Sequence, residues 1–143
     1  MTGHHPPLPR LTLNIGITGH RLKAIPEDML EPLGRKLDEV FGLLRAGVTA
    51  LEERRSAFYD RSPAVLRLHT PLASGADQMA ATSAQAHDYE IRALLPFGSH
   101  EYGRDFAEGT EARQYRDLLK ESDEIFCLPG SRERAPAAPP PRS

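Results

Sequence analysis

The sequence predicts an α/β domain with a mainly parallel sheet of about four strands. Two observations predict this fold. Four short apolar runs alternate with three longer segments of helical periodicity, and strands that alternate with helices form βαβ units with parallel sheets. The chain of 143 residues also has the length of one domain. We therefore expect a single sheet between two layers of helices, a three-layer α/β/α arrangement.

The four predicted strands are the apolar runs at 11–18, 64–69, 91–95 and 124–128. The first run places an apolar side chain at every second position and is rich in branched residues, as strands are. If this strand is central, right-handed crossovers give the order 3-2-1-4. That order puts a topological switch point between strands one and four, where ligands of open α/β sheets bind.

Apolar residues recur every three or four positions over 26–58, which predicts one long amphipathic helix. Glu27 and Asp28 in its first turn complement the positive end of the helix dipole. Shorter patterns of the same kind predict helices over 75–87 and 110–121.

The two ends of the chain lack these patterns. Residues 1–10 and 130–143 are rich in proline and show no periodicity, so both are expected to be disordered tails. The folded domain is therefore predicted to span residues 11–129.

Composition excludes several classes of function. The net charge of −2, from 18 Lys and Arg against 20 Asp and Glu, provides no broad basic field, so DNA binding is disfavoured. No apolar run approaches the ~20 residues of a membrane-spanning helix. Cys127 has no partner for an internal disulfide and is expected to be a small buried apolar residue. We expect a cytoplasmic protein that does not enter membranes.

The loop after the first strand has the composition of an anion site. Thr18, Gly19, His20 and Arg21 follow the apolar run directly. The glycine allows close approach of a ligand to the backbone, and Arg21 offers a planar fork of donors to phosphate. The loop matches neither the G-x-G-x-x-G dinucleotide fingerprint nor the P-loop, and a simple tight turn is the alternative.

The loop after the second strand combines a helix start with small side chains. Ser74 and Asp77 have the spacing of a capping box. Ser74, Gly75 and Ala76 are all small, which leaves backbone N–H groups accessible to a phosphate or to ribose hydroxyls. Capping and ligand contact are compatible with each other.

The loop after the third strand is dense in polar groups. Glu101 and Tyr102 are candidates for contact with a base or sugar, and Arg104 is a candidate for a phosphate. In the alternative interpretation Tyr102 and Phe106 pack the loop onto the sheet, which we prefer for Phe106.

Three histidines, His20, His69 and His100, lie at or just after predicted strand ends. They lack any spacing typical of metal ligands. We therefore expect no metal site and no cofactor.

The motifs that carry a family resemblance are 15–21 (IGITGHR), 72–77 (LASGAD), 95–97 (LPF), Glu101-Tyr102 and Asp105-Phe106. In this order and spacing they resemble the SLOG superfamily, the Rossmann-like domains named for Smf/DprA and Lonely Guy proteins. The resemblance covers about residues 12–128 and is nearest to the bacterial branch of stand-alone or fused sensor domains.

This resemblance implies a Rossmann-like fold and a pocket for a nucleotide or nucleotide-derived small molecule. The positions that match the pocket are Gly19, His20, Arg21, Ser74, Gly75, Asp77, Glu101 and Tyr102. Lonely Guy enzymes carry a Pro-Gly-Gly-x-Gly-Thr loop after a later strand, together with a catalytic Arg and Glu. In this chain Pro129-Gly130 is followed by Ser-Arg-Glu instead.

Three functions therefore stand as hypotheses. The first is a non-catalytic nucleotide-binding or sensor domain. The second is a nucleotide phosphoribohydrolase that cleaves an N-glycosidic bond, with Glu101 or Asp77 as its catalytic carboxylate. The third is a degenerate copy that has kept the sheet and lost the ligand, in which the exposed sheet edge pairs with a second chain to give a homodimer.

Overall fold

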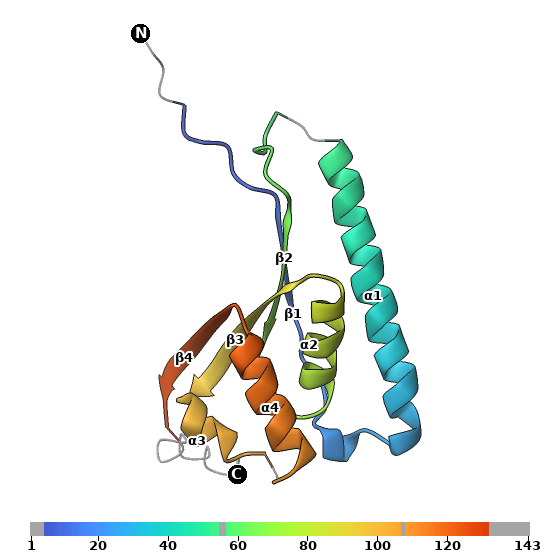
Figure 1. The fold of residues 1–143 in the computed structure, drawn as a ribbon, viewed down its shortest axis with the longest axis vertical. Coiled ribbons are helices and arrows are strands. Elements are labelled where there is room, and N and C mark those ends of the chain that lie inside the picture. Colours follow the sequence, from blue (N-terminus) through green and yellow to red (C-terminus); the bar gives the residue numbers. More distant parts are fainter. Residues whose placement is uncertain (1–4, 55–56, 107, 132–143) are drawn as a thin grey trace, which may run out of the picture.

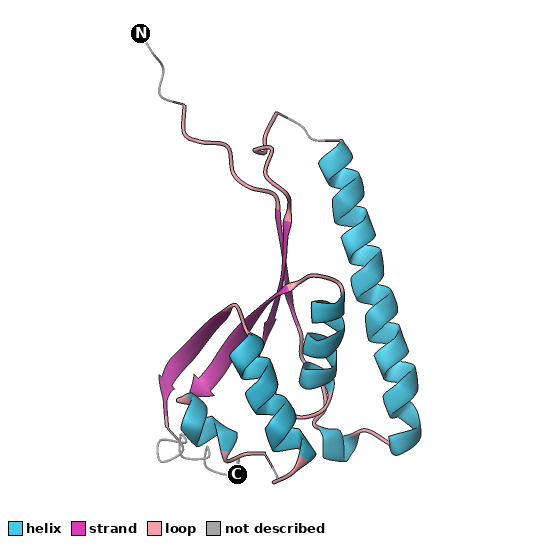
Figure 2. Ribbon diagram, viewed as in Figure 1, coloured by secondary structure: helices cyan, strands magenta, loops and turns pink. Residues whose placement is uncertain are grey.

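The computed structural model describes residues 5–54, 57–106 and 108–131. Its four strands form one parallel sheet, and its helices lie along the chain between them (Figure 1, Figure 2). The strands are β1 (Thr12–Gly16), β2 (Val65–Thr70), β3 (Glu90–Phe97) and β4 (Glu124–Gly130). The helices are η1 (Leu22–Ala24, a 3-10 turn), α1 (Glu27–Glu53), α2 (Ala76–Ala86), α3 (Ser99–Gly103) and α4 (Thr110–Glu121).

The strands lie in the order β1-β2-β3-β4, so the predicted order 3-2-1-4 is wrong. The prediction assumed a central first strand, whereas β1 pairs only with β2 and forms an edge. Each strand pairs with the next one along the chain, and the pairing does not change direction among the described strands. The sheet therefore has no switch point between β1 and β4.

This strand order also replaces the expected three layers by two. Successive right-handed crossovers that move in one direction place all their helices on the same face of a sheet. Consistent with this, α2 contacts α1, α4, β2 and β3, and side chains of α1, α2 and α4 share one core with the sheet. The side chain of Tyr102 on α3 belongs to the same core.

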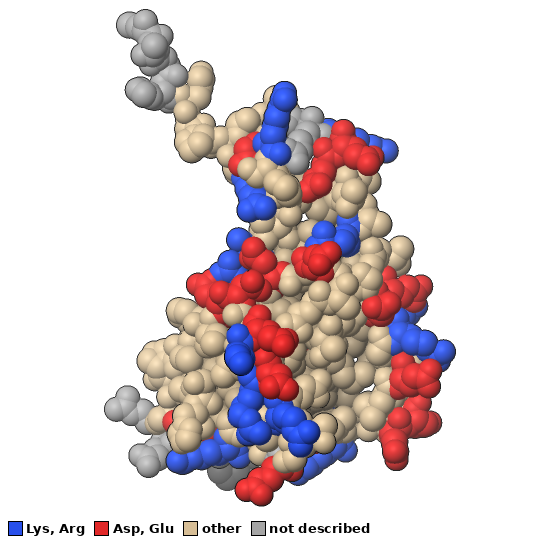
Figure 3. Space-filling view, viewed as in Figure 1, with Lys and Arg blue, Asp and Glu red and all other residues tan. Residues whose placement is uncertain are grey.

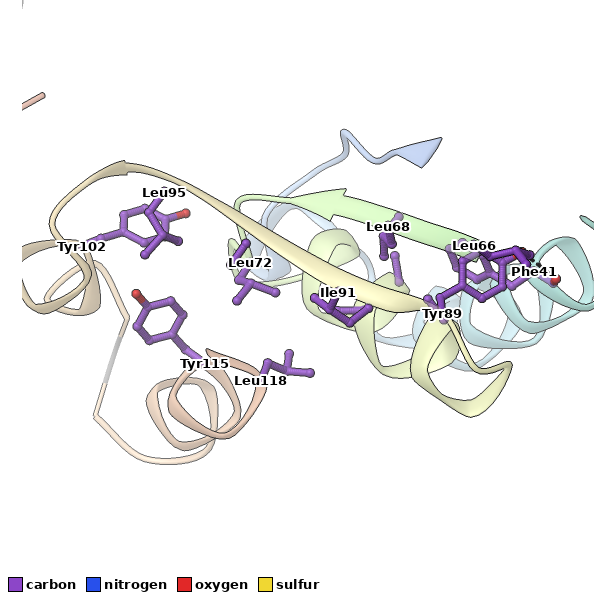
Figure 4. Close-up of a cluster of buried hydrophobic side chains, with 14 of the residues drawn as sticks. Phe41, Leu66, Leu68, Leu72, Tyr89, Ile91, Leu95, Tyr102, Tyr115 and Leu118 are labelled. Atoms are coloured by element: carbon purple, nitrogen blue, oxygen red, sulfur yellow. Dashed lines mark hydrogen bonds between the residues drawn. The ribbon is translucent and has the colours of Figure 1, made fainter. Parts of the chain in front are cut away.

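The covered face carries the core. Along β2, Leu66 and Leu68 are buried and Arg67 between them is only half-buried, and β3 shows the same alternation around Ile91. The core extends along both strands from Phe41 of α1 at one end to Leu95 and the tyrosines of α3 and α4 at the other (Figure 4). The alternation of apolar and polar residues along these strands therefore indicates that helices cover one face of the sheet only.

Helix α2 packs closely because it presents alanines. Ala80, Ala81 and Ala84 have no exposed surface. On the α1 side, a Cβ added to Gly34 would lie 3.8 Å from the Met79 Cε atom, and one added to Gly42 would lie 3.2 Å from the His87 ring. Small residues on both helices therefore set their separation.

The uncovered face is held by polar pairs across the strands. Asn14 of β1 lies 3.0 Å from the His69 ring of β2. Glu90 of β3 pairs with Arg67 at 2.8 Å and with Arg92 at 3.2 Å. The Asn14–His69 and Arg67–Glu90 contacts link neighbouring strands directly.

Arg92 continues this network to the last strand, since it also pairs with Glu124. All seven residues of β4 are exposed, among them Phe126 and Leu128 at 55% and 50%. Cys127 is exposed too, so the prediction that it is buried is wrong. The reason is that β4 is an edge strand at the margin of the helical layer.

No described helix is long and apolar enough to cross a membrane.

The chain ends were predicted to be tails. Residues 1–4 and 132–143 lie outside the described residues. Residue Pro9 accepts a hydrogen bond from the Asp60 N–H at 3.0 Å, and Arg10 donates one to the Pro63 carbonyl at 2.6 Å. The segment just before β1 is therefore joined to the loop before β2.

Candidate functional site

The loops that follow β1 and β2 pack directly against each other at the carboxyl ends of the strands. Gly75 has φ +94, and an added Cβ there would lie 2.5 Å from the Leu22 nitrogen and 2.6 Å from the His20 carbonyl oxygen. An added Cβ on Gly19 would lie 2.5 Å from the Ala76 Cβ. Both glycines are therefore required sterically for the two loops to meet.

The backbone of the first loop caps the helix that starts in the second. The Ala76 N–H donates to the His20 carbonyl at 3.1 Å. This donor, which was predicted to be open to a ligand, is satisfied within the protein. Ala76 thus contributes to the site by packing, while Thr18, Gly19, His20 and Arg21 remain on the exposed side of the junction.

The predicted capping box at Ser74 and Asp77 is wrong. The N-cap of α2 is Gly75, and the helix has no side-chain cap. Ser74 precedes this N-cap by one residue, so it lies one position too early to cap the first turn of α2. Its side chain is buried, at 8% exposure. The Asp77 carboxylate instead accepts a hydrogen bond from the Ala73 N–H.

The second loop is held in one conformation by polar groups that the sequence motifs did not include. Leu72 has φ +56, an uncommon value for a residue with a side chain, and is fully buried. Its N–H donates to the Thr70 Oγ1 atom at 3.1 Å, and its carbonyl accepts from the Gln78 side chain at 3.2 Å. Thr70 and Gln78 are both buried.

Arg21, Asp77 and Tyr102 form an electrostatic group that joins three loops. Burial raises the pKa of Asp77, and the Ala73 hydrogen bond and the Arg21 charge partly offset this rise. Burial also raises the pKa of Tyr102, which Arg21 lowers and Asp77 raises. The structure therefore brings together a predicted residue from each of the three loops.

Tyr102 lies on α3, a five-residue helix that the sequence analysis missed because its polar residues resemble a loop. Its ring packs edge-on against those of Phe97, Phe106 and Tyr115, at centroid distances of 5.4–5.7 Å. Phe106 is 6% exposed and stacks on Tyr115 at 4.2 Å, which confirms the packing role preferred for it. Tyr102 combines this packing role with its place beside Asp77.

The two candidate carboxylates occupy different surroundings. Asp77 is 5% exposed and interacts with Arg21. Glu101 is half-buried on α3, one residue before Tyr102. Of the two, Asp77 is the carboxylate that lies in the electrostatic group.

A cleft of about 300 Å³ opens beside the loop junction, between η1 and the starts of α2 and α4. Leu22 and Gly75 line it from the two loops, and Glu108 and Glu111 line it from the α4 side. Sequence analysis missed both glutamates because they follow no strand. Among the described residues that line this cleft, these two glutamates are the ones with charged side chains, and both charges are negative.

The histidines are distributed over the molecule. His69 contacts Asn14 on the uncovered face of the sheet, whereas His20 is exposed in the loop after β1 and His100 is exposed on α3. Over the described ranges, no three His, Cys, Asp or Glu side chains come together as metal ligands.

Comparison with known proteins adds no family assignment, since the chain matches no family model and no curated protein sequence.

Proposed function

We propose that this protein binds a nucleotide or a nucleotide-derived small molecule at the carboxyl ends of β1, β2 and β3. The observation that carries the proposal is the junction of the first two loops, where Gly75 fits against the His20–Leu22 backbone. The same junction includes the loop that bears Arg21, whose charge lowers the pKa of the buried Asp77 and Tyr102. The resemblance of the three loops to the sensor-type SLOG domains supports the same proposal.

Each part of the site suits one part of a nucleotide. The exposed Arg21 guanidinium offers paired donors to a phosphate. Glu108 and Glu111 in the adjacent cleft offer acceptors to ribose hydroxyls or to the amino group of a base. The cleft volume of about 300 Å³ lies at the lower end of the range for small-molecule sites.

The direct test is calorimetric titration of the protein with AMP, GMP, NAD and ADP-ribose. We expect at least one to bind, and Arg21→Ala to weaken that binding by about 1.5–3 kcal/mol, the contribution of a hydrogen bond to a charged group. Arg35→Ala, on the exposed surface of α1, is the matched control and should leave the affinity unchanged. The proposal is refuted if none of the four compounds binds.

A second function rests on the surroundings of Asp77. A buried carboxyl with a raised pKa beside an arginine is typical of acid–base catalysis. In this function the protein hydrolyses the N-glycosidic bond of a nucleoside monophosphate. Incubation with AMP should then release adenine, and both Asp77→Asn and Glu101→Gln should be assayed. Binding of AMP without release of adenine would leave the sensor function alone.

We further propose a cytoplasmic location and self-association through β4. The free, exposed Cys127 is suited to a reducing compartment. The exposed edge strand with Ile125, Phe126 and Leu128 offers a surface for a second copy. Size-exclusion chromatography with light scattering at several concentrations should show a dimer, and a monomer at all concentrations would contradict the self-association.

A further inference from the structure

A second cleft, of about 430 Å³, lies between α3 and α4. Its α3 side consists of Ser99, His100 and the turn to Arg104, and its α4 side includes Tyr115, Arg116 and Leu119. Arg21, Asp77 and the glutamates of the first cleft do not line it. The two clefts are therefore built from different described residues, and α4 contributes to both.

The walls of the second cleft are held in place by packing. The Tyr115 hydroxyl donates to the Ser99 carbonyl at 3.2 Å and so joins α4 to the start of α3. The Tyr115 ring also stacks on Phe106 at 4.2 Å. A Cβ added to Gly103 would be in ordinary contact with the Tyr115 ring at 3.5 Å. The cleft therefore exists in the free protein.

The charge of this cleft is positive. Arg104 and Arg116 line it and are exposed, and His100 lies beside them. Its described lining contains no Asp or Glu, in contrast to the first cleft with its two glutamates. Figure 3 shows Lys and Arg side chains over α4 and below it, with Asp and Glu side chains among those over the helix. Burial raises the pKa of Tyr115 to about 12, so its hydroxyl adds no negative charge at neutral pH.

Part of the lining of the cleft is apolar. Ala112, Tyr115 and Leu119 follow one another at helical spacing on α4, and all three line the cleft. A cleft lined by two guanidinium groups and by apolar side chains favours a ligand with an anionic head and an apolar body. A polyanion would need a longer basic surface than this cleft provides.

We propose that the cleft between α3 and α4 is a binding site for a small organic anion, in which Arg104 and Arg116 hold a phosphate or carboxylate and Leu119 and Tyr115 contact an apolar or aromatic group. The proposal is independent of nucleotide binding at the first site, because the two sites use different arginines. It also assigns a role to Arg116, which no motif in the sequence indicates.

The test is an NMR titration of the ¹⁵N-labelled full chain with phenyl phosphate, benzoate, inorganic phosphate and benzyl alcohol. We expect phenyl phosphate or benzoate to shift the amide signals of 99–104 and 112–119. The two aromatic anions distinguish a phosphate from a carboxylate head. Inorganic phosphate and benzyl alcohol should each bind at least tenfold more weakly than the better aromatic anion, because each lacks one half of the interaction.

Two variants decide between this cleft and unspecific attraction. The double variant Arg104→Gln with Arg116→Gln should weaken binding at least tenfold. Arg113→Gln is the matched control, since Arg113 lies on the same helix and lines a different cleft. Equal losses in the two variants, or shifts confined to 18–21 and 74–77, would overturn the proposal. Both arginines are exposed, so the variants should fold, and their amide spectra report this directly.

The same titration separates this proposal from the proposed function. Arg21→Ala should leave phenyl phosphate and benzoate binding unchanged, while it weakens nucleotide binding. If Arg21→Ala weakens both, the two ligand classes share one site and the second site is refuted.

Discussion

The two faces of the sheet differ in how they are stabilised. On the covered face, Leu66, Leu68 and Ile91 are almost completely buried against the helices. On the other face, Glu90 pairs with Arg67 and Arg92 pairs with Glu124 across the strands, and these ion pairs remain partly exposed. Buried apolar area dominates folding free energy, whereas exposed ion pairs contribute little. Most of the stability should therefore come from the covered face, and the ion pairs should mainly fix which strands are neighbours.

The comparison is tested most strongly by the same substitution on a buried and on an exposed leucine. Leu68 has no exposed surface, whereas Leu128 of β4 is 50% exposed. At concentrations low enough for the chain to be monomeric, we expect Leu68→Ala to lower the free energy of unfolding by about 3 kcal/mol, and Leu128→Ala to change it by less than about 0.5 kcal/mol. Urea denaturation measures both. Equal losses would show that β4 is buried in the monomer.

The next largest loss of stability is expected at the junction of the loops that follow β1 and β2. Gly75→Ala introduces both backbone strain and a clash with His20 and Leu22, so we expect a loss of about 2–3 kcal/mol. Gly109 has a similar φ of +110 but nothing within 4 Å of an added Cβ. Gly109→Ala should therefore cost only about 1 kcal/mol, the strain alone. A smaller loss for Gly75→Ala than for Gly109→Ala would contradict the junction.

A smaller effect on stability is expected at Asp77, the buried carboxyl in the first turn of α2. Burial raises its folded pKa above the ordinary value of 3.8, so its contribution to stability is present below that pH and lost as the pH rises through the folded pKa. The stability of Asp77→Asn relative to the natural protein should therefore increase from pH 4 to pH 7. Thermal unfolding at each pH measures this difference, and a decrease would refute the assigned burial cost.

The smallest effect belongs to the uncovered face. The hydrogen bond from Arg67 lowers the pKa of Glu90 below its ordinary value of 4.5, and Arg92 lowers it further. The stabilisation is thus present above about that pH and is lost as the pH falls through the folded pKa. Because the pair is partly exposed, Glu90→Gln should cost less than about 1 kcal/mol at pH 7.

The control for Glu90 is a double-mutant cycle with Arg67→Gln at pH 7 and pH 3. The coupling between the two residues should be weaker at the lower pH, because the pH has then fallen toward the folded pKa of Glu90. A coupling of equal strength at both pH values would mean that the pair acts through packing rather than charge.

The sequence predicts the local elements well and their arrangement poorly. Helix α4 has the predicted bounds of Thr110–Glu121, because its apolar positions recur at helical spacing and place Tyr115 and Leu118 in the core. The apolar runs at 64–69 and 91–95 predict β2 and β3, whose apolar side chains are largely buried. Such patterns depend only on neighbours along the chain, and a short sequence window contains them.

The strand order could not be read in this way. It depends on pairs such as Arg67 with Glu90 and Arg92 with Glu124, whose members lie on different strands. The same limit explains Cys127, whose exposure depends on which strand forms the edge. The site residues were predicted only in part. The loops of Arg21, Asp77 and Tyr102 were recognised from their place after strands, and the second cleft was not, because its arginines follow no motif.

The measurement that tests the central claim most directly is a nuclear Overhauser experiment on cross-strand contacts. In the order β1-β2-β3-β4, Leu94 of β3 pairs with Phe126 of β4, and Ile15 of β1 lies opposite Leu68 of β2. We predict backbone contacts between Leu94 and Phe126. If Ile15 contacts β4 instead, β1 is a central strand. That result would contradict the order β1-β2-β3-β4 and the placement of all helices on one face of the sheet.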